Sequence, residues 1–219
     1  MAGSTDPIIG IENWSALAKD APIDGIISLF QNSGNSFSLT LDETLKQSKI
    51  LHVYFMLDSA GKIEFFVIPA ASDVKGKSVF SSNLPISQLG ASKTTINNDN
   101  NNELITWIDN WCNQTLRDAW LMKVTQAAQV LVIHTSDFTV NDNHECYLAL
   151  KPNTNPNINN QYALDLVVQN TSTGNYLNAM VQSPEGTIGY ADMARPVPPY
   201  DNGVNSDTAE SDFGILESL

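Results

Sequence analysis

The chain is poor in charged side chains, and in basic ones most of all. Only 16% of its 219 residues are charged, and 24 acids stand against 11 bases, which leaves a net charge of −13. A nucleic acid or an anionic membrane surface would meet this negative field, and the sequence holds no basic run to offset it. We therefore expect neither nucleic acid nor membrane as a partner.

Long apolar runs and export signals are missing as well. No apolar stretch approaches the roughly 20 residues that span a bilayer. The first residues, MAGSTDPIIG, lack the basic start and apolar centre of a signal peptide. Two cysteines 34 positions apart, Cys112 and Cys146, make no disulfide framework. These features predict a soluble cytoplasmic protein with reduced cysteines.

Signature motifs of catalysis are also lacking. The sequence has no G-x-S-x-G elbow, no phosphate-binding Walker loop, no dinucleotide fingerprint and no C-x-x-C or H-E-x-x-H zinc pattern. We therefore expect no bound cofactor. What the chain does have is 42% apolar residues, enough to build an ordinary globular core.

The apolar pattern predicts a single α+β domain over residues 1–200. Short helices are expected near the N-terminus, followed by a β-hairpin with strands at 50–57 and 63–68. The connection DSAG supplies Asp58 at the turn start and Gly61 where a positive φ is needed. Both strands are apolar on both faces, so the sheet should be covered on both sides.

One long amphipathic helix is predicted over residues 103–129. Its apolar side chains recur with a period of 3.6 residues and should lie across the sheet. We expect the three tryptophans of this helix to pack in the core; an exposed one would instead anchor a partner. The stripe and the tryptophans comprise Leu104, Ile105, Trp107, Ile108, Trp111, Cys112, Leu116, Ala119 and Trp120.

Four strand-like runs follow the long helix: QVLVIHT, CYLALK, YALDLVVQ and YLNAMVQ. Asn-rich and Pro-rich turns separate them. Together with the hairpin they predict a mostly antiparallel fold of one or two sheets, with helices packed on a face.

Residues 134–150, HTSDFTVNDNHECYLAL, hold the densest group of reactive side chains. If strands at 130–135 and 144–150 paired as a hairpin, His134 and His144 would approach each other at its mouth. Two imidazoles and a nearby carboxylate are a ligand set that transition metals accept. The candidate metal ligands are therefore His134 and His144 with a carboxylate from Asp137, Asp142 or Glu145, although their spacing matches no strong metal motif.

Cys146 is the second reactive candidate, as a thiol nucleophile with His134 or His52 as its base. Alternate residues of a strand share a face, which puts Cys146 in line with Leu148 and Leu150. That phasing favours a small buried side chain over a nucleophile. We expect Cys112, on the helix stripe, to be buried too.

Residues 201–219 carry five acids and no base, which predicts a disordered acidic tail. The end of this tail is apolar, and such a motif can fold onto a partner's groove or sheet edge. A chain end that simply frays is the alternative. The candidate partner-binding residues are Phe213, Ile215, Leu216 and Leu219.

Two functions of different class follow from these patterns. The first is a non-catalytic interaction module or accessory piece of an assembly, with a protein partner or self-association. The second is a hydrolase-like enzyme that uses His134, His144 and nearby carboxylates, with or without a metal. The missing catalytic motifs favour the first.

Overall fold

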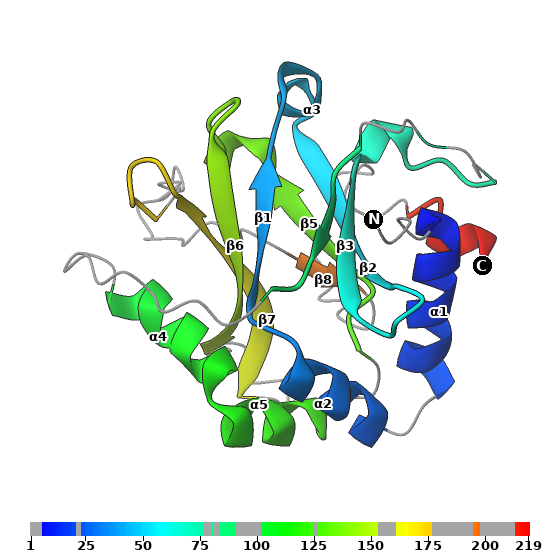
Figure 1. Cartoon of the computed structure of the whole chain (residues 1–219), viewed down its shortest axis with the longest axis vertical. Coiled ribbons are helices and arrows are strands. Elements are labelled where there is room, and N and C mark those ends of the chain that lie inside the picture. The colour runs from blue at the N-terminus through cyan, green and yellow to red at the C-terminus, as the bar shows by residue number, and fades with distance from the viewer. Residues whose placement is uncertain are drawn as a thin grey trace, which may run out of the picture.

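The fold is built from two antiparallel sheets that face each other (Figure 1). The computed structural model describes residues 6–20, 23–76, 80, 84–90, 102–124, 127–152, 161–176, 195–197 and 213–219. Within these residues one sheet has the strand order β4-β3-β2-β5-β8 and the other has the order β1-β6-β7. This arrangement confirms the α+β class with mostly antiparallel strands.

The five-stranded sheet is centred on the predicted hairpin, which is confirmed. Strands β2 and β3 pair antiparallel, with Tyr54 opposite Phe66. The Gly61 N–H donates to the Asp58 carbonyl and the Asp58 N–H to the Lys62 carbonyl, which closes the turn, and Gly61 has a φ of +75°. The strands of this sheet are β2 (Ile50–Leu57), β3 (Ile63–Pro69), β4 (Ile86–Gln88), β5 (Val130–His134) and β8 (Arg195–Val197).

The three-stranded sheet has β6 in the middle. Phe37 of one edge strand pairs with Cys146, and Val168 of the other pairs with the same residue. Its strands are β1 (Ser36–Thr40), β6 (Asn143–Pro152) and β7 (Tyr162–Asn170). The fourth predicted strand, YLNAMVQ, lies almost wholly outside the described residues.

The main core fills the space between the two sheets. Because strand side chains alternate between faces, every second residue of each strand points into this space. The rings of Phe37 and Phe65 stack across it with centroids 4.1 Å apart. The strand members of this core are Phe37, Leu39, Leu51, Val53, Phe55, Ile63, Phe65, Val67, Leu131, Ile133, Cys146, Leu148, Leu150, Leu164, Leu166 and Val168.

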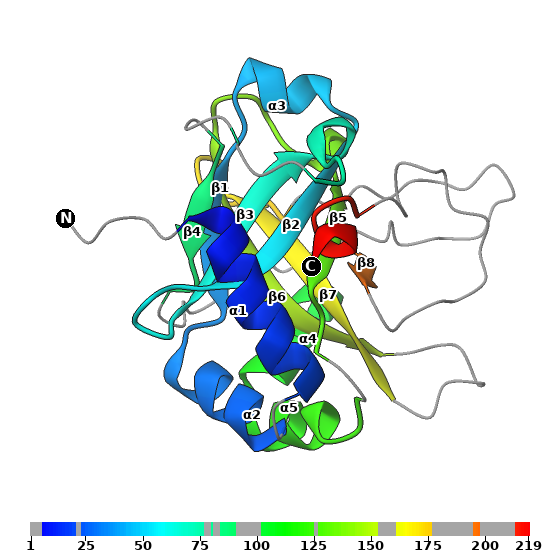
Figure 2. The same ribbon diagram turned by 90° about the vertical axis from the view of Figure 1, so that its right-hand side faces the viewer.

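Each sheet also has an apolar outer face with its own cover. Helix α1 (Pro7–Asp20) lies across β2, and Figure 2 shows it over the five-stranded sheet. A Cβ on Gly10 would come within 3.0 Å of the Met56 Cβ, so the glycine permits this close approach. On the other sheet α4 packs against β6, where Ile108 meets Tyr147 and Val167. Coverage on both sides, expected from the two-faced apolar strands, is therefore present.

The predicted long helix is two shorter helices, α4 (Asn102–Cys112) and α5 (Gln114–Leu121). The break falls at Asn113, whose backbone is extended and whose side chain accepts a hydrogen bond from the Leu116 N–H. An asparagine that caps a new helix ends the periodicity of the one before it. Cys112, the last residue of α4, is exposed, so the prediction that it is buried is wrong.

The remaining helices lie near the N-terminus. Helix α2 (Ile23–Asn32) buries Ile26, Ile27 and Phe30 at one end of the main core. The short α3 (Glu43–Gln47) follows β1 and is capped by the Asp42 side chain. In the part of the chain that the structure describes, no helix has both the length and the apolarity to cross a bilayer.

Replacing Asn113 with alanine tests whether the cap holds α5 in place. The lost hydrogen bond, 3.2 Å from Asn113 Oδ1 to the Leu116 nitrogen, should lower the free energy of unfolding by about 1 kcal/mol. Urea denaturation measures this change in the free energy of unfolding. Asn13→Ala, at an exposed interior position of α1, is the control, and it should stabilise slightly because alanine is the better helix former. Equal effects in the two variants would contradict the capping role.

Candidate functional site

His134 and His144 do not meet at the mouth of a hairpin. His134 ends β5, where it pairs with Ile50 in the five-stranded sheet, whereas His144 lies in β6 of the other sheet. His134 also shares the outer face with Val130 and Val132, while His144 points with Cys146 toward the main core. Strands 130–135 and 144–150 therefore do not form the hairpin on which the two-histidine hypothesis depended, because each strand pairs within a different sheet.

His144 is a buried structural histidine. Its Nε2 accepts a hydrogen bond from the Thr139 N–H at 3.2 Å, and the ring meets Phe138 edge-on at 5.0 Å. Burial lowers the pKa of His144 and outweighs the opposing charge of Asp142. The neighbouring Asp142 accepts instead from the Asn170 amide at 2.7 Å. These contacts close the turn before β6.

The other predicted carboxylate ligands are dispersed. Glu145 is 3% exposed and accepts hydrogen bonds from Ser36 and Ser38 across the β1–β6 pair, at 2.5 and 2.9 Å. Asp137 ends the short turn Thr135–Asp137, and its side chain lies outside the described residues. Where side chains are described, no three His, Cys, Asp or Glu residues come together as a metal site.

Cys146 lies in the core, as its strand phasing predicted. It is 0% exposed, between the two sheets, and burial raises the pKa of its thiol well above the ordinary value. A protonated thiol without access to solvent is a poor nucleophile. Cys112, exposed at the end of α4, accepts a hydrogen bond from the Asn35 amide at 2.9 Å.

A polar cluster that sequence reasoning missed lies on the outer face of the five-stranded sheet. Asp73 follows β3 and the turn Ala70–Ser72, and its Oδ2 accepts from two neighbours on β2. The His52 Nδ1 lies 2.7 Å away and the Tyr54 hydroxyl 2.5 Å away. Burial and the Asp73 charge together raise the pKa of Tyr54, so the phenol stays protonated and donates.

The third neighbour of Asp73 comes from the far end of the chain. The Ile215 N–H donates to Asp73 Oδ1 at 2.8 Å, in a buried position. The Phe213 ring lies against His52 with centroids 4.8 Å apart. Residues 213–219, called here the C-terminal segment, include a short 3-10 helix, Leu216–Ser218. Three hydrogen-bond donors from two distant parts of the chain thus converge on one carboxylate.

Gly214 shows how closely the C-terminal segment fits. A Cβ at this position would lie 2.4 Å from the Lys75 nitrogen and 2.6 Å from the Asp73 carbonyl oxygen. Both atoms belong to the backbone, which cannot give way as a flexible side chain would. Only glycine fits here, and the segment rests directly on residues 73–76.

Further polar contacts hold the other end of the segment. The Gly76 N–H donates to the Ser218 hydroxyl at 2.7 Å, and that hydroxyl donates to the Gly214 carbonyl at 2.7 Å. Lys75 and Glu217 form an exposed ion pair of 3.7 Å, which adds little stability. We call the receiving surface, made by His52, Tyr54 and residues 73–76, the segment site.

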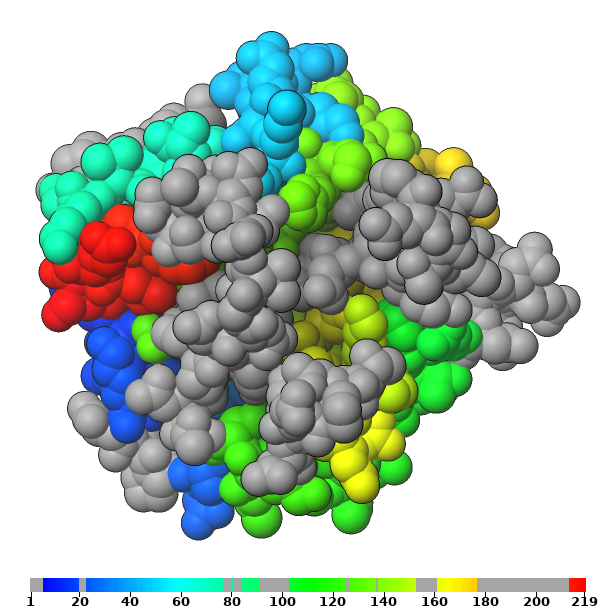
Figure 3. Space-filling model, turned by 180° about the vertical axis from the view of Figure 1, so that it is seen from behind, coloured from blue at the N-terminus to red at the C-terminus, as the bar shows by residue number. Residues whose placement is uncertain are grey.

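The predicted partner-binding residues thus lie on the protein's own domain. Phe213 and Ile215 are buried with Ile11 in the outer core, Leu216 packs at its margin and Leu219 is 43% exposed. The expectation of a disordered tail is wrong for residues 213–219, since their apolar side chains dock on the domain, whereas residues 201–212 lie outside the described residues. Figure 3 shows the segment in red at the molecular surface, beside the blue α1.

One signal for this site was present in the sequence. His52 and Tyr54 stand at alternate positions of the strand ILHVYFML, so both polar groups point to one face of an otherwise apolar strand. Buried polar groups require partners, which predicts a polar residue nearby. Nothing in the sequence identifies that partner as Asp73.

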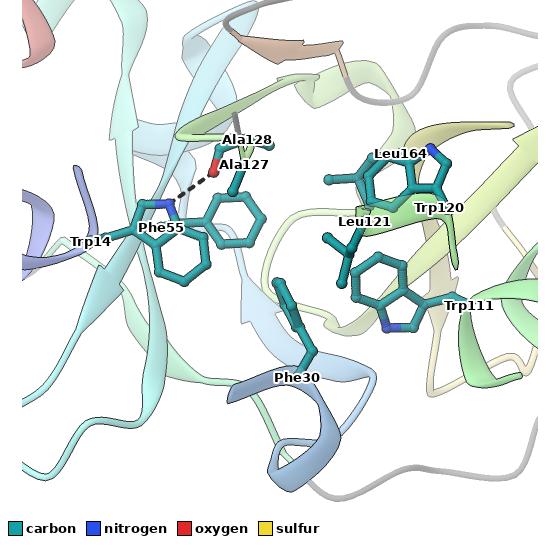
Figure 4. A pocket seen from close by; sticks show the side chains of 9 residues that line it. All are labelled: Trp14, Phe30, Phe55, Trp111, Trp120, Leu121, Ala127, Ala128 and Leu164. Atoms are coloured by element: carbon teal, nitrogen blue, oxygen red, sulfur yellow. Dashed lines mark hydrogen bonds between the residues drawn. The ribbon is translucent and has the colours of Figure 1, made fainter. Parts of the chain in front are cut away.

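A cluster of aromatic side chains, separate from the segment site, lies at one end of the main core. Figure 4 shows Trp14, Phe30, Trp111 and Trp120 around a small cavity. Its volume of about 10 Å³ has room for a single water molecule at most and is too small for an organic ligand. The predicted burial of the tryptophans of α4 and α5 is confirmed, with Trp107, Trp111 and Trp120 at most 5% exposed.

Comparison with known proteins gives no relative. No protein-family model, no curated protein and no solved structure matches this chain significantly. Function has to be inferred from the geometry of its own residues.

The lowered pKa of His144 predicts that stability falls at mildly acid pH. The unfolded chain binds a proton near the ordinary histidine pKa of about 6.5, and the folded chain only at lower pH. The contribution of His144 to the free energy of unfolding is complete above pH ~6.5. Below that pH it declines by at most about 1.4 kcal/mol per pH unit. Urea denaturation between pH 7.5 and 5.5 should show this slope, and His144→Gln should flatten it. An unchanged slope in His144→Gln, or a flattened one in the control His134→Gln, would contradict the assignment.

The two thiols should differ in reactivity. Under native conditions a thiol reagent should modify Cys112, which is exposed, and leave Cys146 untouched until the protein unfolds. Counting modified cysteines by mass spectrometry, before and after denaturation, checks this. In Cys112→Ser the native protein should take up no reagent, and rapid labelling of that variant would show that the core opens at Cys146.

Proposed function

We propose that this protein is a non-catalytic interaction module that works by docking and releasing a short apolar segment on the outer face of its five-stranded sheet. One observation carries the proposal: the segment site holds residues 213–219 through Asp73 and admits only glycine at position 214. Such a fit is the kind found between a peptide and its receptor, where backbone hydrogen bonds give affinity and side-chain pockets give specificity.

The surroundings of Asp73 support recognition over catalysis. His52 and Tyr54 are 0% exposed, and the Phe213 ring covers the imidazole. Asp73 accepts from both side chains through Oδ2 and from the Ile215 N–H through Oδ1, so both of its oxygens are engaged. A carboxylate held in this way is shaped to accept one backbone N–H, which is what an incoming peptide offers.

The C-terminal segment can also undock without breaking the strand pairing of either sheet. Its contacts run to the outer face and to residues 73–76, and it adds no strand to either sheet. Phe213 and Ile215 share the outer core with Ile50, Ile68 and Val132, so departure of the segment would uncover part of that apolar core. A surface of that kind, rimmed by the polar groups of Asp73 and His52, marks an interaction site. Docking and release are therefore the two states of the proposed module.

Gly214→Ala in the full chain tests the proposal. The added methyl has no room 2.4 Å from the Lys75 nitrogen, so the segment should leave its site. Hydrogen exchange should then show the Ile215 amide unprotected while the amides of β2 and β3 stay protected. Gly25→Ala is the matched control, since its Cβ would find its nearest neighbour at 3.9 Å and should leave Ile215 protected.

The emptied site should accept the segment as a separate peptide. A synthetic DFGILESL peptide should bind the Gly214→Ala protein in calorimetry, and the same peptide with alanine in place of its glycine should not. Binding of both peptides, or of neither, to a variant that has released its own segment would overturn the proposed function.

A further inference from the structure

We infer that the C-terminal segment of one copy of this protein docks in the segment site of a second copy, so that two molecules assemble by segment exchange. This inference rests on the proposed function and names its partner. The occupant is the same chemical sequence that the structure shows in the site, supplied by another molecule.

The contacts of the segment do not depend on which copy supplies it. Ile215 reaches Asp73, Ser218 reaches Gly76 and Gly214 rests on Lys75, all about 140 positions away in sequence. These hydrogen bonds and apolar contacts would be identical if the segment came from a neighbour. Exchange of an identical element is a low-cost route to a dimer, because bound and exchanged states share one interface.

The connection to the segment is long enough for exchange. β8 ends at Val197 and the segment begins at Phe213, so the 15 residues 198–212 join them. Fully extended, they span at most about 50 Å. A domain of this size has a radius of gyration of about 17 Å, so the connection can reach across to an adjacent copy. Reciprocal exchange then closes into a two-fold dimer.

Charge and local concentration decide when exchange occurs. A tethered segment meets its own site at an effective concentration on the order of millimolar, which favours docking within one chain. The net charge of −13, with four acids and no base in residues 198–212, also keeps copies apart. Exchange should therefore increase with protein concentration and with salt, which screens the repulsion. It should dominate where a chain's own segment cannot occupy its own site.

Two full-length variants with complementary defects test this directly. Gly214→Ala keeps the site intact and disables the segment, whereas Asp73→Ala disables the site and keeps the segment intact. Each variant alone should sediment as a monomer. Mixed in equal amounts, they should form a one-to-one complex, since the Asp73→Ala segment can occupy the Gly214→Ala site. Substituting Gly214 as well in the Asp73→Ala chain should abolish the complex.

The outcomes separate the two proposals. If Gly214→Ala releases its segment and binds the DFGILESL peptide, yet the mixture stays monomeric up to millimolar concentration, exchange is overturned and the proposed function stands. If Gly214→Ala binds no peptide after releasing its segment, the proposed function fails first. A complex that persists when both chains carry Gly214→Ala would place the contact elsewhere and also overturn exchange.

A disulfide cross-linking experiment tests exchange independently if the Asp73→Ala chain does not fold. Lys75→Cys in one chain and Glu217→Cys in another alter only the exposed ion pair, and Cys112→Ser in both removes the exposed native thiol. Only exchange brings the two new thiols together, so oxidation of the mixture should yield a disulfide-linked heterodimer. The yield should rise with salt and with concentration. If oxidation joins the two thiols only when both substitutions are in one chain, the segment docks within its own molecule and exchange is refuted.

Discussion

The structure depends on one constraint: the central hairpin is apolar on both of its faces. Val53 and Phe55 point to one side of β2, Tyr54 and Met56 to the other, and all four are at most 1% exposed. Neither face can be left in water, because burial of such side chains is the main favourable contribution to folding. The three-stranded sheet covers the inner face. α1 and the C-terminal segment share the outer one.

The polar cluster follows from that same constraint. His52 and Tyr54 belong to the outer face, so covering it buries an imidazole and a phenol along with the apolar side chains. Buried polar groups without partners destabilise a fold by roughly 1–3 kcal/mol each. Asp73 supplies the partner, and the Ile215 N–H occupies the carboxylate oxygen that β2 leaves open. Stability of the outer core and recognition of the segment therefore rest on the same atoms.

The histidines and cysteines that drew most attention in the sequence have ordinary structural roles. Cys146 fills a gap between the sheets, and His144 closes a turn through the Thr139 backbone. Neither meets His134, which lies on the outer face of the other sheet. Proximity along the chain suggested a site because β5 and β6 are consecutive, and consecutive strands usually pair. Here the pairing of β5 with β2 and of β6 with β1 separates them.

The sequence by itself determined the features that local chemistry controls. The β2–β3 hairpin follows from two runs of aromatic and β-branched residues joined by a turn glycine, and the burial of Cys146 from its phase with Leu148 and Leu150. Tertiary structure decided which strands pair, where the long helix breaks, and that Asp73 meets both His52 and Ile215. The physical reason is sequence separation: Asp73 and Ile215 lie 142 positions apart. Only the packing of the whole outer face brings them together.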